Sequence, residues 1–389
     1  MNEPLPPQSQ LTPLARLLSE EIRSRGALRF DAFMNQALYH PQYGYYMQAR
    51  ERIGKAGDFF TSSSVHALFG RLIARQLAEM AELLQTETFE VVEQGPGEGH
   101  LALDILDALA EEQPRLYDRL RYTLVEVSPN NRERQAKTLA AHADKIFWAN
   151  GDDWSLAAGC FLSNELVDAF PVHLVEKHAG QLHEVFVALG EGGREFVEEL
   201  HPIAAGPLQD HLTWLGVALA DGSRAEINLL APTWMRQVAK QIERGFVLTI
   251  DYGYPAEELY APHRRQGTLM CYRHHQADDN PYDHVGEKDI TCHVNFSALQ
   301  KAGKEAGLET LWFGEQYRFL LGLGFFEELV RLEAETDDER QARALRLTLK
   351  NLIMPEAGMG ETFKILVQGK NVGNPMLRCN RPVAAIPFG

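Results

Sequence analysis

The sequence predicts an α/β fold of the Rossmann-like kind, with a mainly parallel sheet between two layers of helices. The first observation is the order of patterns between residues 89 and 170, where short apolar runs alternate with stretches of helical periodicity. The second is a glycine-rich turn at 95–99 that joins an apolar run directly to a helical stretch. Consecutive strand–helix–strand units of this kind build parallel sheets covered by helices on both faces.

The elements of this fold are expected in the following order. Helices at 11–25, 30–38 and 65–84 precede the sheet, because each range places apolar residues at helical spacing. We expect the strands of the sheet at 89–94, 122–127, 145–149, 159–164, 245–251, 310–313 and 362–368. We expect the other helices at 99–111, 130–142, 166–170, 232–244 and 296–306, with a helical stretch at 315–352.

The alternation of strands and helices stops after residue 171. Three apolar runs follow at 172–176, 182–189 and 195–200, joined by Ala-Gly and Gly-Gly turns that are typical of antiparallel strands. The sequence therefore predicts a β-rich insertion. The expected division is a helical extension at 1–85, a core at 86–171 and 231–370, the insertion at 172–230, a loop-rich lid at 252–295 within the core, and a tail at 371–389.

Composition and charge narrow the classes of partner. The 389 residues carry a formal net charge of −16, which argues against a nucleic-acid surface, since phosphates must be met by lysine and arginine. No long apolar run indicates a membrane span. Cys160, Cys271, Cys292 and Cys379 are too scattered for a zinc site or a disulfide pattern, and the first residues show no targeting signal. We therefore expect a cytoplasmic protein.

The glycine-rich turn carries the strongest functional signal. Gly95, Gly97 and Gly99 stand at alternate positions between a strand and a helix. Glycines let the backbone approach a nucleotide closely, and the N–H groups of the helix N-terminus point toward it. Glu93, just before the glycines, would repel a pyrophosphate and attract an amino group. The turn therefore favours S-adenosylmethionine (SAM) as the cofactor.

Two other interpretations of the turn stay open at this point. A dinucleotide site would need a third glycine at position 100, where His100 stands, and no Gly-Lys-Ser/Thr tripeptide indicates a phosphate loop nearby. NAD or FAD is therefore disfavoured as the cofactor. The second alternative is a glycine turn that serves the fold alone.

Two further acidic residues are candidates for cofactor contacts. Glu126 ends the second expected strand, 27 residues after Gly99, where an acidic residue commonly holds the ribose hydroxyls of a nucleoside. Asp152, after the third strand, could reach the adenine amino group. The alternative for both is an acid at the surface that faces water.

The segment after the fourth strand holds the candidate catalytic residues. Asn164, Glu165 and Asp168 follow that strand, and ligands of open α/β sheets bind at the carboxyl ends of the strands. Paired carboxylates could orient a guanidinium, which offers five donors in a rigid fork. Acids in the first turn of a helix also stabilise the helix dipole, so capping is the alternative.

The lid holds seven residues of metal-ligating types. Their spacing lacks the H-x-x-x-H pair or compact ligand set of a metal site, so we expect no metal. The residues are His274, His275, Asp278, Asp279, Asp283, His284 and His293.

Several motifs together resemble those of the MidA-like methyltransferases. The motifs lie at 57–62, 69–70, 93–99, 124–129, 164–171, 251–253 and 286–296. The resemblance covers residues 12–370 and implies a class I SAM-dependent fold, a sheet of seven strands with a final antiparallel hairpin. It also implies a loop that covers the cofactor, formed by Gly57, Asp58, Phe59, Thr61 and Ser62.

Two positions depart from the pattern of this family. Ser63 stands where many relatives carry proline, and Asn295 stands where aspartate is common. Neither departure removes a cofactor contact that the resemblance implies.

The sequence therefore predicts a SAM-dependent protein arginine N-methyltransferase with an arginine-bearing protein substrate. Because arginine has a pKa above about 12, Glu165 or Asp168 would accept a proton as the new bond forms. The alternatives are a SAM-binding assembly factor without catalysis and a nicotinamide-dependent oxidoreductase. A homodimer is compatible with the sequence, which does not identify the acceptor protein.

Overall fold

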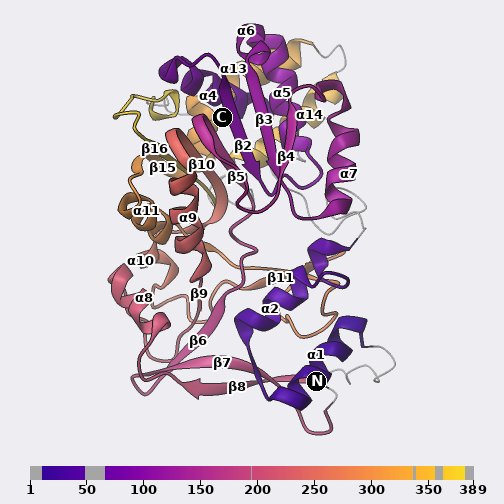
Figure 1. Cartoon of the computed structure of the whole chain (residues 1–389), viewed down its shortest axis with the longest axis vertical. Coiled ribbons are helices and arrows are strands. Elements are labelled where there is room, and N and C mark those ends of the chain that lie inside the picture. Colours follow the sequence, from indigo (N-terminus) through magenta and orange to yellow (C-terminus); the bar gives the residue numbers. More distant parts are fainter. Residues whose placement is uncertain (1–10, 49–65, 194, 336–338, 355–361, 382–389) are drawn as a thin grey trace. The chain divides into compact units, whose positions relative to one another are not determined.

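Figure 1 shows the computed structural model, which describes residues 11–48, 66–193, 195–335, 339–354 and 362–381. The described residues fall into two compact units. Unit 1 takes its residues from Met1–Phe59, Val167–Thr233 and Tyr254–Leu299, and unit 2 takes them from Phe60–Leu166, Trp234–Gly253 and Gln300–Gly389. Each unit has a hydrophobic core of its own.

Unit 2 is built on the predicted sheet. Five strands run parallel to their neighbours, whereas the strand next to the edge is antiparallel to both of its neighbours. This arrangement confirms the α/β fold and its final antiparallel hairpin. The order is β15 (Glu309–Glu315), β16 (Phe363–Lys370), β10 (Ile242–Tyr254), β5 (Leu156–Asn164), β2 (Phe89–Gln94), β3 (Leu120–Val125) and β4 (Ile146–Ala149).

Helices contribute to unit 2 on both faces of this sheet. Successive residues of a strand point to opposite faces of the sheet. On one face, Val91 and Cys160 belong to a core shared with α4 and α5. On the other face, Phe161 packs on Trp234 of α9, with ring centroids 5.9 Å apart. The helices are α4 (Leu68–Leu84), α5 (His100–Glu112), α6 (Pro114–Asp118), α7 (Pro129–Thr138), η3 (Ala140–His142), α9 (Leu230–Gln241), α11 (Phe296–Glu305), α12 (Gln316–Gly322), α13 (Phe325–Ala334), α14 (Glu339–Ile353) and η4 (Arg378–Asn380).

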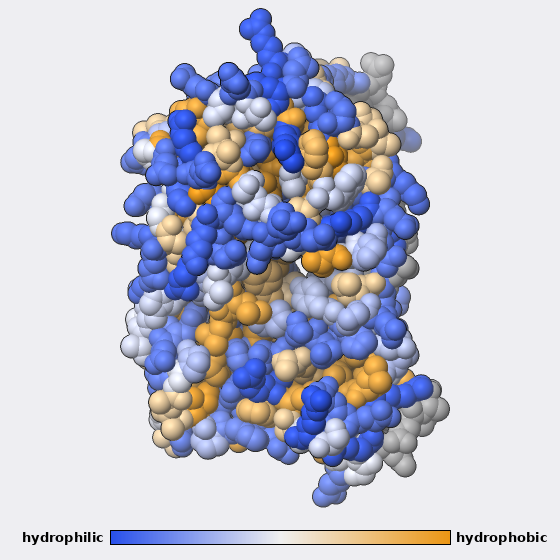
Figure 2. Space-filling view, in the orientation of Figure 1, coloured by the Kyte–Doolittle hydropathy of each residue, from blue (hydrophilic) through white to orange (hydrophobic). Residues whose placement is uncertain are grey.

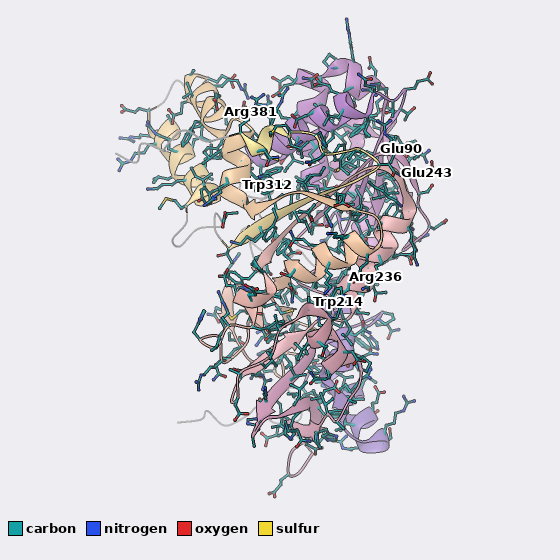
Figure 3. All side chains as sticks on the ribbon, turned by 90° about the vertical axis from the view of Figure 1, so that its left-hand side faces the viewer. Glu90, Trp214, Arg236, Glu243, Trp312 and Arg381 are labelled. Carbon is teal, nitrogen blue, oxygen red and sulfur yellow. The ribbon has the colours of Figure 1, made fainter. Side chains whose placement is uncertain are left out.

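The two ends of the sheet differ in role. Glu90 and Glu243, labelled in Figure 3, mark the amino-terminal ends of β2 and β10. The glycine turn and the candidate catalytic residues follow the opposite, carboxyl-terminal ends. Ligands of parallel sheets bind at the carboxyl-terminal ends, so the fold places the candidates where a ligand is expected.

Unit 1 combines helices with two small sheets. In one sheet β7 pairs with β1, β6 and β8, and β6 pairs with β9, while in the other β11 pairs with β12 and β13. The elements are α1 (Pro13–Arg25), β1 (Leu28–Arg29), α2 (Phe30–Tyr39), η2 (Tyr45–Met47), β6 (His173–His178), β7 (Gln181–Leu189), β8 (Phe196–Pro202), α8 (Pro207–Leu215), β9 (Arg224–Ile227), α10 (Ala256–Leu259), β11 (Met270–Arg273), β12 (Gln276–Asp278), β13 (Asp289–Thr291) and β14 (Val294–Asn295).

The helix predicted at 166–170 is wrong. These residues form a turn in which the Phe170 N–H donates to the Val167 carbonyl at 3.1 Å. Two local causes oppose a helix, because Glu165 has a left-handed φ of 51° and Pro171 disfavours helical backbone at the residue before it. Capping of that helix by Glu165 and Asp168 is therefore no longer an alternative.

Other parts of the chain are more ordered than the sequence suggested. The segment expected as a loop-rich lid contains α10 and the sheet of β11, β12 and β13. The predicted insertion has its three antiparallel strands as β6, β7 and β8, but it also contains α8 and β9. Among the described residues, no helix is long and apolar enough to cross a membrane.

Candidate cofactor and catalytic site

The glycine turn is shaped by backbone that other residues rarely adopt. Gly95, Gly97 and Gly99 have φ values of 71°, 54° and 85°. A Cβ at Gly95 would lie 2.8 Å from Leu166 Cδ1, and a Cβ at Gly99 would lie 3.3 Å from Leu139 Cδ1. The backbone conformation therefore favours glycine at the turn, while the added Cβ atoms would press on the ends of leucine side chains that can shift. Gly99 begins α5 with its N-terminal N–H groups toward the turn.

Glu93 lies buried at the end of β2. Its carboxylate accepts a hydrogen bond of 2.8 Å from the Tyr122 hydroxyl, and its side chain is almost entirely removed from solvent. Burial raises the pKa of Glu93 to about 7, against the opposing effect of the Tyr122 hydrogen bond. A cation near this carboxylate would restore its charge, so the position suits the positively charged methionine part of SAM.

Glu126 is held at the end of β3 by several donors. The Ser128 N–H donates to Oε1 at 2.7 Å, while the Asn131 and Gln135 amides donate to Oε2 at 3.1 Å each. Burial nevertheless raises the pKa of this carboxyl, and the hydrogen bonds oppose that rise. The backbone of Val127 also hydrogen-bonds to this carboxyl. These donors hold Glu126 after the second strand of the parallel sheet, where an acidic residue commonly accepts from ribose hydroxyls.

Gln135 joins Glu126 to the glycine turn. Its side-chain N–H groups donate to the Gly97 carbonyl at 2.8 Å and to Glu126 at 3.1 Å. The Trp148 ring N–H donates to Gln135 Oε1 at 3.0 Å, which fixes the orientation of the amide. Gln135 is fully buried, so the three contacts form one network that positions both parts of the candidate cofactor site.

Arg132 stabilises the other side of the same region. Its guanidinium donates to the carbonyls of Glu126 and Ala149 at 2.7 Å each and to Asn150 Oδ1 at 2.6 Å. The chain then turns at Asp152, whose side chain is exposed and whose carbonyl accepts from the Gln241 amide at 2.6 Å. The candidate adenine contact thus lies next to an ordered turn.

The ends of β5 and β10 place polar groups together. The Glu165 N–H donates to the Ile250 carbonyl at 2.9 Å, and the Leu166 N–H donates to Asp251 Oδ2 at 3.2 Å. The Asn164 amide donates to Glu165 Oε1 at 3.1 Å. Within the described part of the chain, Asn164 Oδ1 is buried without a hydrogen-bond partner, and Ser163 Oγ is as well. Such acceptors fit a ligand with N–H or O–H groups.

Two groups of predicted residues are not part of the contacts described so far. Asp168 belongs to unit 1, where it is buried and its carbonyl accepts from the Cys292 N–H at 3.1 Å. The residues predicted to cover the cofactor lie outside the described residues; they are Gly57, Asp58, Phe59, Thr61 and Ser62.

A candidate metal cluster occurs outside the predicted His-rich segment. Asp31, His173 and Glu184 offer ligand atoms within 4.8 Å of one another. The atoms already form ion pairs, with His173 Nδ1 at 2.7 Å from Glu184 and Arg29 Nε at 3.1 Å from Asp31. The cluster is thus accounted for by hydrogen bonds and an ion pair within unit 1.

Several residues of the network escaped the sequence analysis. Asn131, Gln135 and Trp148 show no motif of their own, and Trp234 donates from its ring N–H to Gln94 Oε1 at 2.9 Å behind the turn. A signal existed only for Asn131 and Gln135, which lie on one helix four residues apart and so on one face.

Comparisons with known proteins identify the family. A model of the family described as S-adenosyl-L-methionine-dependent methyltransferase matches residues 72–314. The chain belongs to this family. It is therefore a SAM-dependent methyltransferase with SAM as its cofactor, and the carboxylates and glycines described above fit that group.

Curated relatives and a solved structure resemble most of the chain. The mitochondrial protein arginine methyltransferase NDUFAF7 homolog of Caenorhabditis elegans is 27% identical over 383 residues, with 89% of this chain and 84% of the relative covered. The human mitochondrial NDUFAF7 is 26% identical over 392 residues, with 92% and 83% covered. A crystal structure from Burkholderia thailandensis with bound S-adenosyl-homocysteine is 33% identical, with a TM-score of 0.86 and 97% of each chain covered.

These relatives contradict the predicted cytoplasmic location. The curated proteins from Caenorhabditis elegans, Drosophila melanogaster, zebrafish and human are all named mitochondrial. The scattered cysteines on which the prediction depended indicate only that no disulfide pattern is present, and any reducing compartment permits that. The prediction is therefore withdrawn.

Proposed function

We propose that this methyltransferase modifies an arginine side chain of a protein substrate. The observation that carries the proposal is the polar end of β5. There the Asn164 amide donates to the Glu165 carboxylate, and the Glu165 N–H donates to the Ile250 carbonyl of β10. The names of the curated relatives, which are protein arginine methyltransferases, support the same acceptor.

Each candidate cofactor residue has a proposed role. Gly95, Gly97 and Gly99 admit the cofactor to the backbone at the start of α5, Glu93 attracts its cationic methionine part, and Glu126 accepts from the ribose hydroxyls. Asp152 and Asn164 are proposed contacts to the adenine and to the methionine end. Gly57, Asp58, Phe59, Thr61 and Ser62 are proposed to cover the bound cofactor.

The proposed chemistry uses few residues. SAM supplies an electrophilic methyl group on a sulfonium. We expect Glu165 to orient the guanidinium so that one nitrogen points at that methyl group, which is the contribution that positioning makes to catalysis. As the N–C bond forms and the S–C bond breaks, the guanidinium nitrogen becomes acidic, and Glu165 or Asp168 accepts its proton. Asn164 fixes Glu165 through its 3.1 Å hydrogen bond.

A transfer assay tests the proposal. The protein is incubated with tritiated SAM and protein extract, and the labelled amino acids are separated after hydrolysis. We expect label in methylarginine, and we expect Glu165→Gln to abolish it while SAM binding survives. Glu87→Gln, an exposed acid of unit 2, serves as the matched control. Full activity of Glu165→Gln would remove the proposed role of this carboxylate.

Three further statements about partners and organisation are part of the proposal. The net charge of −16 supports a protein rather than a nucleic-acid partner, and hydrophilic residues predominate on the face drawn in Figure 2. A homodimer is proposed as the oligomeric state to be tested by light scattering. The division into extension, core, insertion, lid and tail is proposed as the set of parts to be tested by limited proteolysis.

A further inference from the structure

The hairpin of β7 and β8 places one long strand at the edge of a sheet in unit 1. β8 pairs with β7 from Phe196 to Pro202, and no other strand among the described residues pairs with it. Figure 1 shows the two strands side by side. The seven residues of β8 exceed the usual strand length of about five or six, and its register with β7 runs without a shift. Proteins usually keep an edge strand short, bulged or covered, so this long and regular edge requires an explanation.

The two ends of the hairpin show which backbone groups of β8 point outward. The Ile203 N–H donates to the Leu182 carbonyl at 2.8 Å, and the Gly190 N–H donates to the Glu195 carbonyl at 3.0 Å. Along an antiparallel strand, residues alternate between bonding to the neighbouring strand and pointing away from it. The odd-numbered residues of β8 therefore bond to β7, and the even-numbered residues direct their backbone polar groups to the open edge. Pro202, which has no N–H, stands at an outward position, where a strand tolerates proline.

Negative charge predominates along this hairpin. Residues 181–202 hold five glutamates and one arginine. The Glu199 side chain is 54% exposed, and its Oε2 lies 3.4 Å from His201 Nε2. Leu200 is 42% exposed, so an apolar side chain follows the acid on the same strand. Because opposite charges on cross-strand pairs are favourable, a strand that pairs with this edge gains from basic side chains.

Glu198 holds the edge in place from the other face of the strand. The Arg224 guanidinium donates to both of its carboxylate oxygens, at 2.7 Å to Oε2 and 2.5 Å to Oε1, and the Tyr282 hydroxyl donates to Oε1 at 2.6 Å. Burial raises the pKa of Glu198, but these donors outweigh that effect and lower it, so the carboxylate keeps its charge and its partners. A strand that is already held in its extended form loses little conformational freedom when a partner pairs with it.

A second copy of the chain is a poor occupant of this edge. When two β8 strands pair antiparallel over their whole length, residues 196–202, Glu199 of one copy lies opposite Glu199 of the other. Like charges directly opposite each other destabilise a strand pair. The formal net charge of −16 also makes two copies repel each other. The charge of the edge therefore favours a partner that carries lysine or arginine.

We propose that the open edge of β8 binds an extended, basic segment of a partner protein, which adds to this sheet of unit 1 as a further strand. Main-chain hydrogen bonds to the even-numbered residues of β8 supply the affinity, while Glu199 and Leu200 select basic and apolar side chains. This interaction goes beyond the proposed methyl transfer, because it involves no residue of the candidate cofactor and catalytic site.

Binding of a basic peptide to the full chain tests the proposal. The probe is a rhodamine-labelled hexapeptide, Lys-Val-Arg-Val-Lys-Thr, and its fluorescence anisotropy is compared with that of Glu-Val-Glu-Val-Glu-Thr. We expect binding of the basic probe alone. Leu200→Pro removes an outward N–H and spares the bonds to β7, so it should raise the Kd by about 2- to 12-fold, the factor equivalent to one hydrogen bond. Leu200→Val keeps the N–H and should bind the probe more tightly than Leu200→Pro.

A second variant keeps the test valid if Leu200→Pro does not fold. Glu199→Gln removes the exposed charge and should raise the Kd by about 1.5- to 5-fold, the factor equivalent to one cross-strand charge pair. Glu257→Gln, an exposed acid of α10, should keep the wild-type Kd. Equal binding of the two probes, or a wild-type Kd in both folded variants, would overturn the proposal.

Amide hydrogen exchange distinguishes strand addition from loose attraction between charges. We expect the basic probe to protect the N–H groups of Phe196, Glu198 and Leu200, whereas those of Glu199 and His201, which bond to β7, should change little. Binding without this alternating protection overturns strand addition. A wild-type dimer that Leu200→Pro converts to a monomer in sedimentation would assign the edge to a second copy and overturn the proposal as well. None of these measurements depends on methyl transfer.

Discussion

Replacement of Gln135 by methionine tests whether the buried network positions the cofactor. Methionine has nearly the same length but cannot donate to Gly97 or Glu126, nor accept from Trp148, so three hydrogen bonds of 2.8, 3.1 and 3.0 Å are lost. The bond to Glu126 involves a charged acceptor and is worth about 1.5–3 kcal/mol. If this loss falls on the bound state, the Kd for SAM rises by about 10- to 150-fold.

The pH dependence of binding should change in the same variant. The hydrogen bond from Gln135 lowers the pKa of Glu126, which burial raises, so the pKa of Glu126 rises further when the donor is removed. A ribose hydroxyl is accepted best by the ionised carboxylate. We therefore expect the affinity of Gln135→Met for SAM to fall more steeply than that of the wild-type protein as the pH is lowered from 8 toward 5.

Isothermal titration calorimetry with S-adenosyl-homocysteine, at several pH values, measures both effects. Gln113→Met makes the same chemical change at an exposed position of unit 2 and serves as the control. Circular dichroism and the melting temperature establish that each variant is folded. A wild-type Kd at every pH in folded Gln135→Met would refute the reasoning that this amide positions Glu126.

Three other substitutions give separate tests. Glu93→Gln should raise the free energy of unfolding above pH 7, because the folded pKa of Glu93, about 7, lies above the unfolded value of 4.5 and the fold disfavours the charged form. Denaturant titrations should show a larger gain in the free energy of unfolding at pH 8 than at pH 5, by no more than about 3 kcal/mol. Glu165→Gly should raise the melting temperature, because glycine adopts the left-handed φ of 51° without the strain of about 1 kcal/mol that other residues carry there. Methyl transfer should be lost. A lower melting temperature would contradict the idea that the strain at Glu165 is kept for activity. Gly95→Ala should weaken SAM binding in calorimetry, since φ is 71° and the new Cβ would lie 2.8 Å from Leu166; wild-type affinity would show that the turn can adjust.

The sequence predicted what depends on local order along the chain. Gly95, Gly97 and Gly99 could be placed because a strand, a turn and a helix follow one another directly, and Glu126 could be placed because it ends the next strand. Gln135 could not be found in this way. Its contact with the Gly97 carbonyl depends on how α7 packs beside the turn, which no spacing in the sequence encodes.

The error at 166–170 has a different physical origin. The five residues there carry helical propensity, but the backbone of Glu165 is held by its N–H bond to the Ile250 carbonyl and the Leu166 N–H is held by Asp251. These contacts come from residues about 85 positions away in the chain. Tertiary hydrogen bonds therefore decided the local conformation, because a segment this short is only marginally stable as a helix even when its residues favour one.

We infer that carboxylates at the ends of the strands select SAM more strongly than the glycines of the turn do. Glu93, Glu126 and Asp251 place a buried carboxylate at or near the ends of three parallel strands. A phenol donates to Glu93, side-chain amides and a backbone N–H donate to Glu126, and the N–H groups of Leu166 and Tyr252 donate to Asp251. A glycine turn of this shape also serves dinucleotides, whose phosphates three carboxylates would repel. A nucleoside with a sulfonium and an amino group brings positive charge and hydroxyl donors to the same places. We therefore propose that the specificity for SAM follows from carboxylates that the fold keeps buried. Substitutions that remove their charge should weaken SAM binding more than substitutions that leave the charge and disturb only the turn.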